Sequence, residues 1–344
     1  MDIKVAIIGS GFGMYGLLPA FSGIKGCQVV SICGKNSERM LNYCKKLGLV
    51  RYTNWREMLQ KEKPNAVAIA VIPSYQYEIA KYALENGIAV FAEKPLTTDH
   101  GTSLEISELA KEKGLPNMLD FIFPEIPEWQ ATKKVIESGL VGKIHKINVD
   151  WAFLSYDLRN SIKSWKTDVQ QGGGALSFYF SHTFYYLEYF LGRIKNVRCQ
   201  LFSSEKSLNK GETSMNMTIL FESGCMGNVN MDISYSGQQK HTLEFFAEGS
   251  KIILKNISDS FVDNFELTVD TGQKIQKIKP DNILDISRDE SEDERVKVIK
   301  PIAERFINWC NTGVEAKPNF EDGLRVQELI LLARDSHYSS QVHD

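Results

Sequence analysis

Residues that could bind a dinucleotide stand close to the amino terminus. Val5–Ile8 is an apolar, mostly β-branched run, and Gly9, Gly11 and Gly13 follow it directly. Glycines between a buried strand and a helix let the backbone approach a pyrophosphate, which the amino terminus of the helix attracts. The strict spacing would place its last glycine at Met14, so the helix must pack on the strand in a different way. The expected cofactor contacts in this turn are Gly9, Gly11, Phe12, Gly13 and Met14.

The form of the cofactor depends on the end of the second predicted strand, Gln28–Cys33. Gly34 stands where a carboxylate would accept the ribose 2'-hydroxyl of NAD, and Lys35 follows it. A cation at this place suits the 2'-phosphate of NADP. Arg39, one turn into the next helix, could add to this charge or could be an ordinary solvated residue. We therefore predict NADP(H) as the preferred cofactor, with NAD(H) as the alternative.

Lys94 is the first candidate for proton transfer. It stands between Glu93 and Pro95 at the end of a predicted strand. When a secondary alcohol loses hydride to nicotinamide, a side chain must take the hydroxyl proton, and the reverse reaction must return it. A lysine at the carboxyl end of a parallel strand, beside the cofactor, can make that hydrogen bond, and desolvation and the positive nicotinamide would lower its pKa. The alternative is an exposed lysine at a strand end.

His182 is the second candidate for proton transfer. An imidazole with its usual pKa of ~6.5 can accept or donate a proton near neutral pH. A lone histidine is ordinarily structural, but Gly172–Gly174 leads into its predicted helix, Ala175–Leu191, and permits a close approach of the backbone. This arrangement favours a catalytic role for His182.

Short β-branched runs alternate with amphipathic stretches in the first third of the chain. The runs Ile3–Gly9, Gln28–Cys33, Ala66–Ile72 and Ile88–Glu93 are typical of buried parallel strands separated by helices. This pattern predicts an α/β Rossmann domain over residues 1–120. It places the glycines and Lys94 at the carboxyl ends of strands.

The pattern changes after residue 120. Trp129–Ser138 is predicted to be a helix and Lys143–Phe153 a strand, and Val197–Val269 is predicted to form consecutive antiparallel strands. The acidic stretch Asp285–Glu294 is expected to be a solvated loop, and amphipathic helices are expected near residues 296–311 and 321–336. Residues 121–344 are therefore predicted to form an α+β domain for substrate binding and oligomerisation. It would have a large, mostly antiparallel open sheet and a last helix that can pack back on the first domain.

Composition excludes several functions. The 344 residues carry 40 basic and 43 acidic side chains, which gives no reason to expect a nucleic acid or an anionic membrane as partner. The six cysteines are scattered, without the spacing of a metal or redox motif. No secretory segment is visible, and no apolar run approaches the ~20 residues of a membrane span. We expect a soluble cytoplasmic protein with reduced thiols.

The stretch Ala92–Leu96, with the sequence A-E-K-P-L, resembles the signature of the glucose-fructose oxidoreductase, inositol dehydrogenase and rhizopine-catabolism (Gfo/Idh/MocA) family. Gly172–Leu176, His182 and Phe320–Val326 match further stretches, so the resemblance covers the whole chain. It implies a Rossmann domain, a second domain with an open sheet, and association through that sheet into a homodimer or homotetramer. It also implies metal-free oxidation of a secondary alcohol, or reduction of the ketone, on a sugar, cyclitol or nucleotide-linked sugar.

The resemblance also implies roles for single residues. Lys94 and His182 would be catalytic, Glu93 would lie near the nicotinamide, and the bond from Lys94 to Pro95 could be cis. Four residues before the histidine the family commonly has an aspartate, where this chain has Phe178. Hydroxyl groups at helical spacing from the histidine could share the acid role, or the histidine could only orient the substrate. The hydroxyl groups come from Tyr179, Tyr185 and Tyr186.

Weaker candidates stand in loops. Trp165 and Lys166 could contact a sugar face and an anionic group of the substrate. Ile72, which ends the third predicted strand, and Pro73 and Gln76 after it are candidates for contacting the cofactor or the substrate. The stretch from residue 120 to residue 129 lacks the asparagine and arginine that the family commonly has there, which predicts changed substrate contacts.

Two other functions compete with the oxidoreductase. A reductase of a non-sugar ring, like the biliverdin reductase relatives of this fold, would keep the Rossmann half, but the stretch from Gly172 to His182 argues against it. A non-catalytic dinucleotide-binding sensor or regulator would explain Phe178, but the presence of Lys94 and His182 favours an enzyme.

Overall fold

The computed structural model describes residues 2–281 and 292–341. These residues form two compact units. The first comprises residues 2–122 and 292–327, and the second comprises residues 123–281 and 328–341. Most of the predicted acidic loop, Asp285–Glu294, lies outside the described residues.

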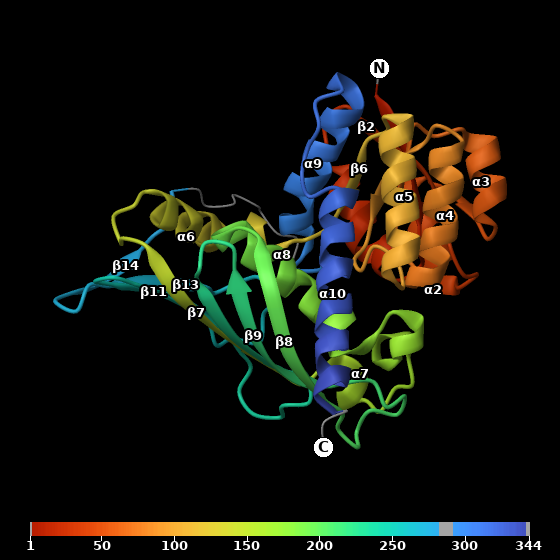
Figure 1. Cartoon of the computed structure of the whole chain (residues 1–344). Helices are drawn as coiled ribbons and strands as arrows, with labels where there is room; N and C mark the ends of the chain where they lie inside the picture. Colours follow the sequence, from red (N-terminus) through yellow and green to blue (C-terminus); the bar gives the residue numbers. More distant parts are fainter. Residues whose placement is uncertain (1, 282–291, 342–344) are drawn as a thin grey trace. The chain divides into compact units, whose positions relative to one another are not determined.

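A six-stranded parallel sheet forms the centre of the first unit (Figure 1). Its strand order, β3-β2-β1-β4-β5-β6, reverses between β1 and β4, and in such sheets a dinucleotide binds beyond the carboxyl ends of the strands at this point. The predicted Rossmann fold is confirmed. The short strands β3 and β6 were not predicted, because three residues are too few to show a period. The strands are β1 (Ile3–Ile8), β2 (Cys27–Cys33), β3 (Val50–Tyr52), β4 (Ala66–Ile69), β5 (Ala89–Ala92) and β6 (Asn117–Leu119).

Helices cover this sheet in two layers. In one layer α3, α4 and α5 lie side by side (Figure 1), and Trp55 of α3 contacts Tyr82 of α4 at 5.3 Å between ring centroids. In the other, α1 packs on α9, and Phe21, Phe91 and Phe306 meet edge to face. The helices are α1 (Leu18–Ser22), α2 (Glu38–Leu47), α3 (Trp55–Glu62), α4 (Pro73–Glu85), α5 (His100–Lys113) and α9 (Val296–Thr312), and a π-helical turn, η1 (Gly13–Leu17), precedes α1.

An eight-stranded sheet forms the centre of the second unit, in the order β14-β13-β12-β11-β7-β10-β9-β8. The pairing is antiparallel except between β7 and β10, so the predicted large, mostly antiparallel sheet is confirmed. The expectation that consecutive strands are neighbours is wrong for β10 and β11, because β7 lies between them. Val149 and Trp151 of β7 are almost fully buried, as suits a central strand. The strands are β7 (Ile144–Ala152), β8 (Ile194–Phe202), β9 (Ser214–Phe221), β10 (Met226–Asp232), β11 (Lys240–Ala247), β12 (Lys251–Asn256), β13 (Glu266–Asp270) and β14 (Ile275–Ile278).

One face of this sheet carries the core of the second unit. Buried and exposed residues alternate along β9, which points Met215, Met217 and Ile219 inward. Trp129 of α6 (Pro127–Glu137) stacks on Phe190 of α8 (Phe180–Leu191) with 5.6 Å between ring centroids. The sequence predicts a single helix over Ala175–Leu191, but the structure divides this stretch into two elements. Its first five residues form a π-helical turn, η5 (Ala175–Tyr179), which precedes α8.

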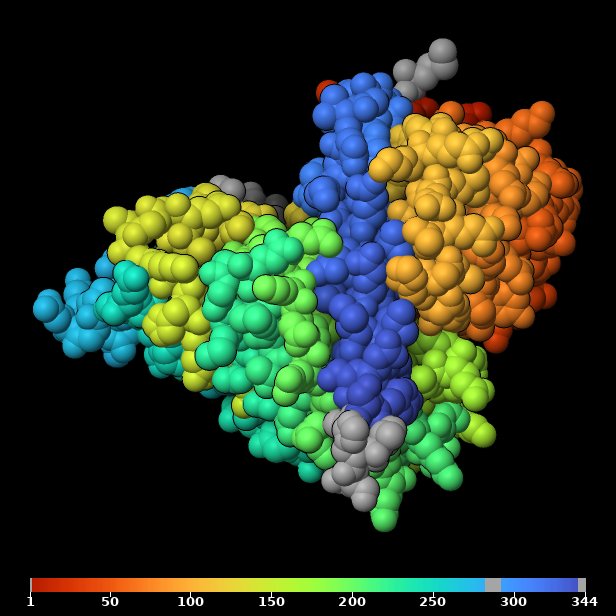
Figure 2. All heavy atoms as spheres, viewed as in Figure 1, coloured from red at the N-terminus to blue at the C-terminus, as the bar shows by residue number. Residues whose placement is uncertain are grey.

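The last helix, α10 (Phe320–Gln341), exposes one face to solvent in the space-filling view (Figure 2). Leu331 and Leu332 are exposed side chains of this helix. Across residues 2–281 and 292–341, no helix combines the length and the apolar character that a membrane span requires.

Candidate active site

The glycine turn after β1 brings its backbone close to neighbouring strands. Gly9 has a φ of +136°, and a Cβ atom there would lie 2.3 Å from the carbonyl oxygen of Ala70 after β4. At Gly13 an added Cβ would lie 3.2 Å from the carbonyl oxygen of Ile8, and Gly16 leaves room for the ring of Phe12. These two glycines explain how the turn packs with Met14 at the expected glycine position. An added Cβ on Gly11 would meet no atom within 4 Å, so this backbone is open to a ligand.

The end of β2 has no room for a side chain at Gly34. An added Cβ there would lie 2.6 Å from the Cβ of Ser10. Lys35 and Arg39 are exposed beside this point. A third cation, Arg51 of β3, was not predicted from the sequence, and its Nη1 donates a hydrogen bond to Asn36 Oδ1 at 2.5 Å. Cationic groups therefore gather at the end of β2.

Lys94 lies directly beyond β5 in a segment held by Gln76. The peptide bond from Lys94 to Pro95 is cis, and Lys94 is only 9% exposed. Gln76 of α4 donates through Nε2 to the carbonyl oxygens of Glu93, Pro95 and Leu96 at 2.6, 3.0 and 3.0 Å. Ile72 and Pro73 form the amino-terminal end of the same helix. Gln76, expected as a ligand contact, thus also shapes the Lys94 segment through its Nε2 atom.

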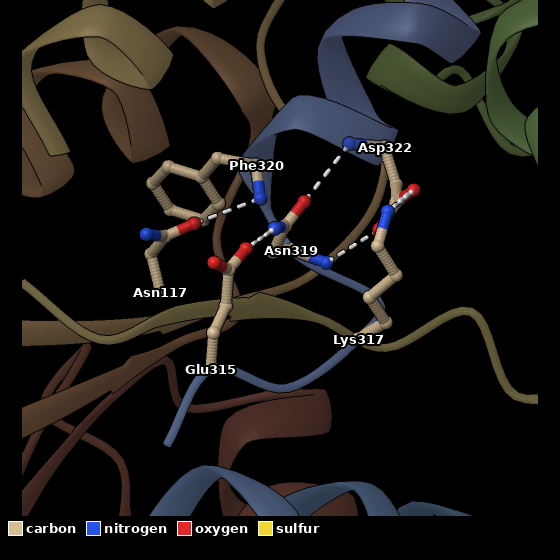
Figure 3. Close-up of polar contacts among 6 residues, drawn as sticks. All are labelled: Asn117, Glu315, Lys317, Asn319, Phe320 and Asp322. Carbon is tan, nitrogen blue, oxygen red and sulfur yellow. Dashed lines mark hydrogen bonds and ion pairs between the residues drawn. The ribbon is translucent and has the colours of Figure 1, made fainter. Parts of the chain in front are cut away.

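The matching stretch Phe320–Val326 supports β6 (Figure 3). The amide of Phe320 donates to Asn117 Oδ1 at 2.8 Å, and the Asn319 amide donates to Asp322 Oδ2 at 2.9 Å. An added Cβ on Gly323 would lie 2.3 Å from Leu119, so this glycine permits the close packing of α10 on β6.

Two charged residues of the first unit, Asp120 and Arg295, escaped the sequence analysis. Asp120 directly follows β6 and is 3% exposed. The Arg295 guanidinium lies 4.2 Å from the ring centroid of Phe12 and pairs with Asp293 at 2.8 Å. Asp120 could have been found from the sequence, because it is the one polar residue between Met118 and Phe123. The contact of Arg295 with the glycine turn forms only on folding.

In the second unit, a buried ion pair holds the glycines that precede α8. Arg334 of α10 donates to Glu212 Oε1 at 2.8 Å and to Ser177 Oγ at 3.1 Å. The Ala175 amide donates to the carbonyl oxygen of Glu212 at 2.9 Å. Gly174 has a φ of +87°, and a Cβ there would lie 2.3 Å from Glu212 Oε1. Gly174 is therefore required by this contact, which fixes the start of the segment that leads to His182.

His182 is buried in α8, 8% exposed, with Phe123 edge-on at 5.2 Å between ring centroids. Tyr186, one turn later, is fully buried and shares a hydrogen bond of 3.1 Å with His241 Nε2. Burial raises the pKa of Tyr186 and lowers the pKa of His241 to about 3. Tyr186 therefore belongs to a core cluster, whereas Tyr179 and Tyr185 are partly exposed.

Phe178 stands where the family commonly has an aspartate, and aromatic side chains lie around it. The Phe178 ring lies edge-on to Trp165 at 5.1 Å and to Tyr179 at 4.6 Å between centroids. Lys166 Nζ lies 5.3 Å from the Phe178 ring centroid. The residues predicted to contact substrate, Trp165 and Lys166, thus gather around Phe178, which has no proton to give.

A doubly wound dinucleotide-binding unit joined to an open-sheet unit defines a class of two-unit oxidoreductases. Residues 3–121 match the sequence profile of the Gfo/Idh/MocA oxidoreductase family with an NAD-binding Rossmann fold, and residues 129–253 match the C-terminal domain of the same family. The chain therefore belongs to the Gfo/Idh/MocA family of oxidoreductases.

Several known proteins are similar to this chain. An uncharacterized oxidoreductase of Synechocystis sp. is 26% identical, with 98% of this chain and 94% of that protein covered. Levoglucosan dehydrogenase of Pseudarthrobacter phenanthrenivorans is 27% identical over 67% of this chain and 62% of its own length. Among solved structures, a levoglucosan dehydrogenase with NADH and L-sorbose has a TM-score of 0.85 at 21% identity. A 3-ketoreductase of Actinomadura kijaniata with NADP and TDP-benzene has a TM-score of 0.80 at 19% identity. Each structure and this chain are covered to 98%.

Proposed function

We propose that the protein is an NADP(H)-dependent oxidoreductase that acts on a secondary alcohol or ketone carbon of a sugar, cyclitol or nucleotide-linked sugar. The observation that carries this proposal is the fixed position of Lys94. Gln76 holds the backbone on both sides of it, in the same unit as the glycine turn. A lysine held in this way is a credible partner for a reacting oxygen, since catalysis depends on such preorganised contacts.

NADP(H) is the proposed cofactor because the site fits its 2'-phosphate better than the free ribose of NAD. The contact between Gly34 and Ser10 excludes the carboxylate that would accept a 2'-hydroxyl. Lys35 and Arg51 supply positive charge and hydrogen-bond donors for a phosphate. Gly9, Gly11, Phe12, Gly13 and Met14 would hold the pyrophosphate. When bound, the cofactor gives or takes hydride at nicotinamide C4.

Lys94 and His182 are the proposed catalytic residues. Lys94 would hydrogen-bond the reacting oxygen and hold the proton that this oxygen gains or loses. His182 would orient the substrate or exchange that proton, with Tyr179 or Tyr185 as a further source of a hydroxyl. Glu93 would contact the nicotinamide half of the cofactor.

The substrate class rests on named relatives and on Trp165 and Lys166. Relatives of this chain include levoglucosan dehydrogenase, D-apiose dehydrogenase and a dTDP-sugar 3-reductase. A tryptophan ring suits the apolar face of a sugar, and a lysine suits a phosphate. We propose that these two side chains contact the substrate.

A binding and turnover assay tests the proposal. Purified protein is titrated with NADPH and NADH by fluorescence, and free sugars, cyclitols and nucleotide-linked sugars, with their keto forms, are then added while absorbance of the reduced nicotinamide is followed. We expect tighter binding of NADPH and turnover of at least one compound. Absence of dinucleotide binding would overturn the proposal. Binding without turnover of any compound would favour a sensor.

A further inference from the structure

Two carboxyl groups lie side by side where strands β5 and β6 end. Ala92 and Leu119 are register partners of this parallel pair, and Glu93 and Asp120 directly follow them. The Asp120 amide donates to the carbonyl oxygen of Ala92 at 3.3 Å, so the two strands continue together. Because side chains alternate between the two faces of a sheet, Glu93 and Asp120 leave on the same face.

The carboxyl group of Asp120 is buried from water, and charged side chains lie near it. It is hydrogen-bonded to the carboxyl group of Glu93. Its Oδ1 atom has no hydrogen-bond partner within residues 2–281 and 292–341. The charged groups that act on it are Glu93 and Lys94 from the end of β5 and Arg295 from the segment before α9.

Burial, and after it the negative charge of Glu93, raise the pKa of Asp120 well above its usual range. Lys94 and Arg295 oppose this shift without cancelling it. Two neighbouring carboxyl groups that cannot both ionise share one proton. A hydrogen bond between two carboxyl groups needs one proton, and the raised pKa of Asp120 favours Asp120 as the group that carries it and donates it to Glu93.

We propose that Asp120 is a positioning residue for Lys94: its buried carboxyl group holds the Glu93 carboxyl group by a hydrogen bond, beside the Lys94 ammonium. This inference rests on the proposed role of Lys94 in proton transfer. If Asp120 ionised, a second negative charge would strengthen the hold of Lys94 on its proton. In the direction of ketone reduction Lys94 must release that proton, so the ionised form of Asp120 is the less active form.

The first test needs no substrate. Infrared difference spectra between the wild type and Asp120→Asn should show, at neutral pH, the carbonyl stretch of a protonated carboxylic acid, which the asparagine lacks. Because the pKa is raised on folding, the protonated group stabilises the wild type at low pH and this contribution is lost as the pH rises through the raised pKa. The gain in melting temperature of Asp120→Asn over the wild type should therefore grow with pH. Glu57→Gln, at an exposed residue of α3, should show neither effect. Absence of the band would overturn the proposal.

The second test is the pH dependence of ketone reduction with NADPH. In the wild type, kcat should decrease in two steps as the pH rises, and one of these steps should come from the ionisation of Asp120. In Asp120→Asn this step should be absent. Asp120→Ala leaves Glu93 without its donor and should lower kcat by about tenfold, with the Kd of NADPH nearly unchanged. Wild-type pH profiles in both variants would overturn the proposal. A wild type without turnover would contradict the proposed function instead, while the infrared band still decides the state of Asp120.

Discussion

A Cβ atom on Gly34 would lie 2.6 Å from the Cβ of Ser10, so the residue after β2 cannot carry a side chain without moving the glycine turn. Position 34, where a carboxylate usually selects NAD, therefore has no room for a carboxylate side chain. In the proposed function, the neighbouring cations would select the cofactor.

The first prediction concerns those cations. Lys35→Ala and Arg51→Ala should each weaken NADPH binding by about tenfold to a hundredfold, because each removes a charge-assisted contact with the 2'-phosphate. The Kd of NADH should change little. Fluorescence titration measures both constants, and Lys45→Ala, at an exposed lysine of α2, is the control. Equal losses for the two cofactors would contradict a role in selection.

The second prediction concerns Lys94. Lys94→Met should lower kcat by ~10² to 10⁴-fold, the usual size of a proton-transfer contribution, with the Kd of NADPH within a few fold of the wild type. Steady-state kinetics and titration of the same preparation separate the two effects. Lys113→Met, at the end of α5, should retain wild-type kinetics. Unchanged turnover in Lys94→Met would exclude Lys94 from the chemistry.

The third prediction concerns Gln76. Gln76→Leu removes the donor to three carbonyl oxygens around Lys94 and should lower the free energy of unfolding by about 2 kcal/mol. It should also lower kcat more than it raises KM, because Lys94 loses its support. Gln60→Leu, which affects an exposed hydrogen bond to Tyr82, should cost less than about 0.5 kcal/mol in urea unfolding. A stability loss without any kinetic effect would show that Lys94 does not depend on this support.

Much of the fold was visible in the sequence, because apolar runs and glycines report local structure. The turn at Gly9–Gly13, the strand before Lys94 and the mostly antiparallel sheet could all be predicted. The insertion of β7 between β10 and β11 could not, because strand neighbours depend on the whole sheet. The role of Gln76 could not be predicted either, because its three acceptor carbonyl groups come together only when the segment around Lys94 packs beside α4 in the folded chain. The sequence showed that Phe178 stands where the family commonly has an aspartate. The structure adds that the Phe178 ring lies among Trp165, Tyr179 and Lys166.

The fourth prediction concerns the ion pair between Glu212 and Arg334, whose side chains are 5% and 16% exposed. Arg334→Met leaves the Glu212 carboxylate buried without its cation and should cost about 3–5 kcal/mol of stability. The double variant Glu212→Met/Arg334→Met should cost less than the sum of the single variants. The exposed pair of Lys81 and Glu105 is the control, where Lys81→Met should cost less than about 1 kcal/mol. Additive losses in a double-mutant cycle would show that the pair is not coupled.

The fifth prediction concerns acid stability. Burial lowers the pKa of His241 to about 3, so the folded protein keeps this imidazole neutral while the unfolded chain takes up a proton below ~6.5. As the pH falls from 6.5 towards 3, His241 should cost about 1.4 kcal/mol of stability per pH unit. The loss in His241→Gln should be less steep by this amount, while the exposed His145→Gln should follow the wild type. Parallel curves for the wild type and His241→Gln would show that His241 does not titrate on unfolding.

Hydride transfer itself is tested most directly with NADPH that carries deuterium at C4. The protein is incubated with each stereoisomer of this cofactor and with the keto compounds of the panel, and the products are analysed by mass spectrometry. We predict that one product gains a single deuterium on the former carbonyl carbon, from only one of the two isomers. If NADPH binds tightly but no product of a broad panel carries deuterium, the protein is not the sugar oxidoreductase proposed here.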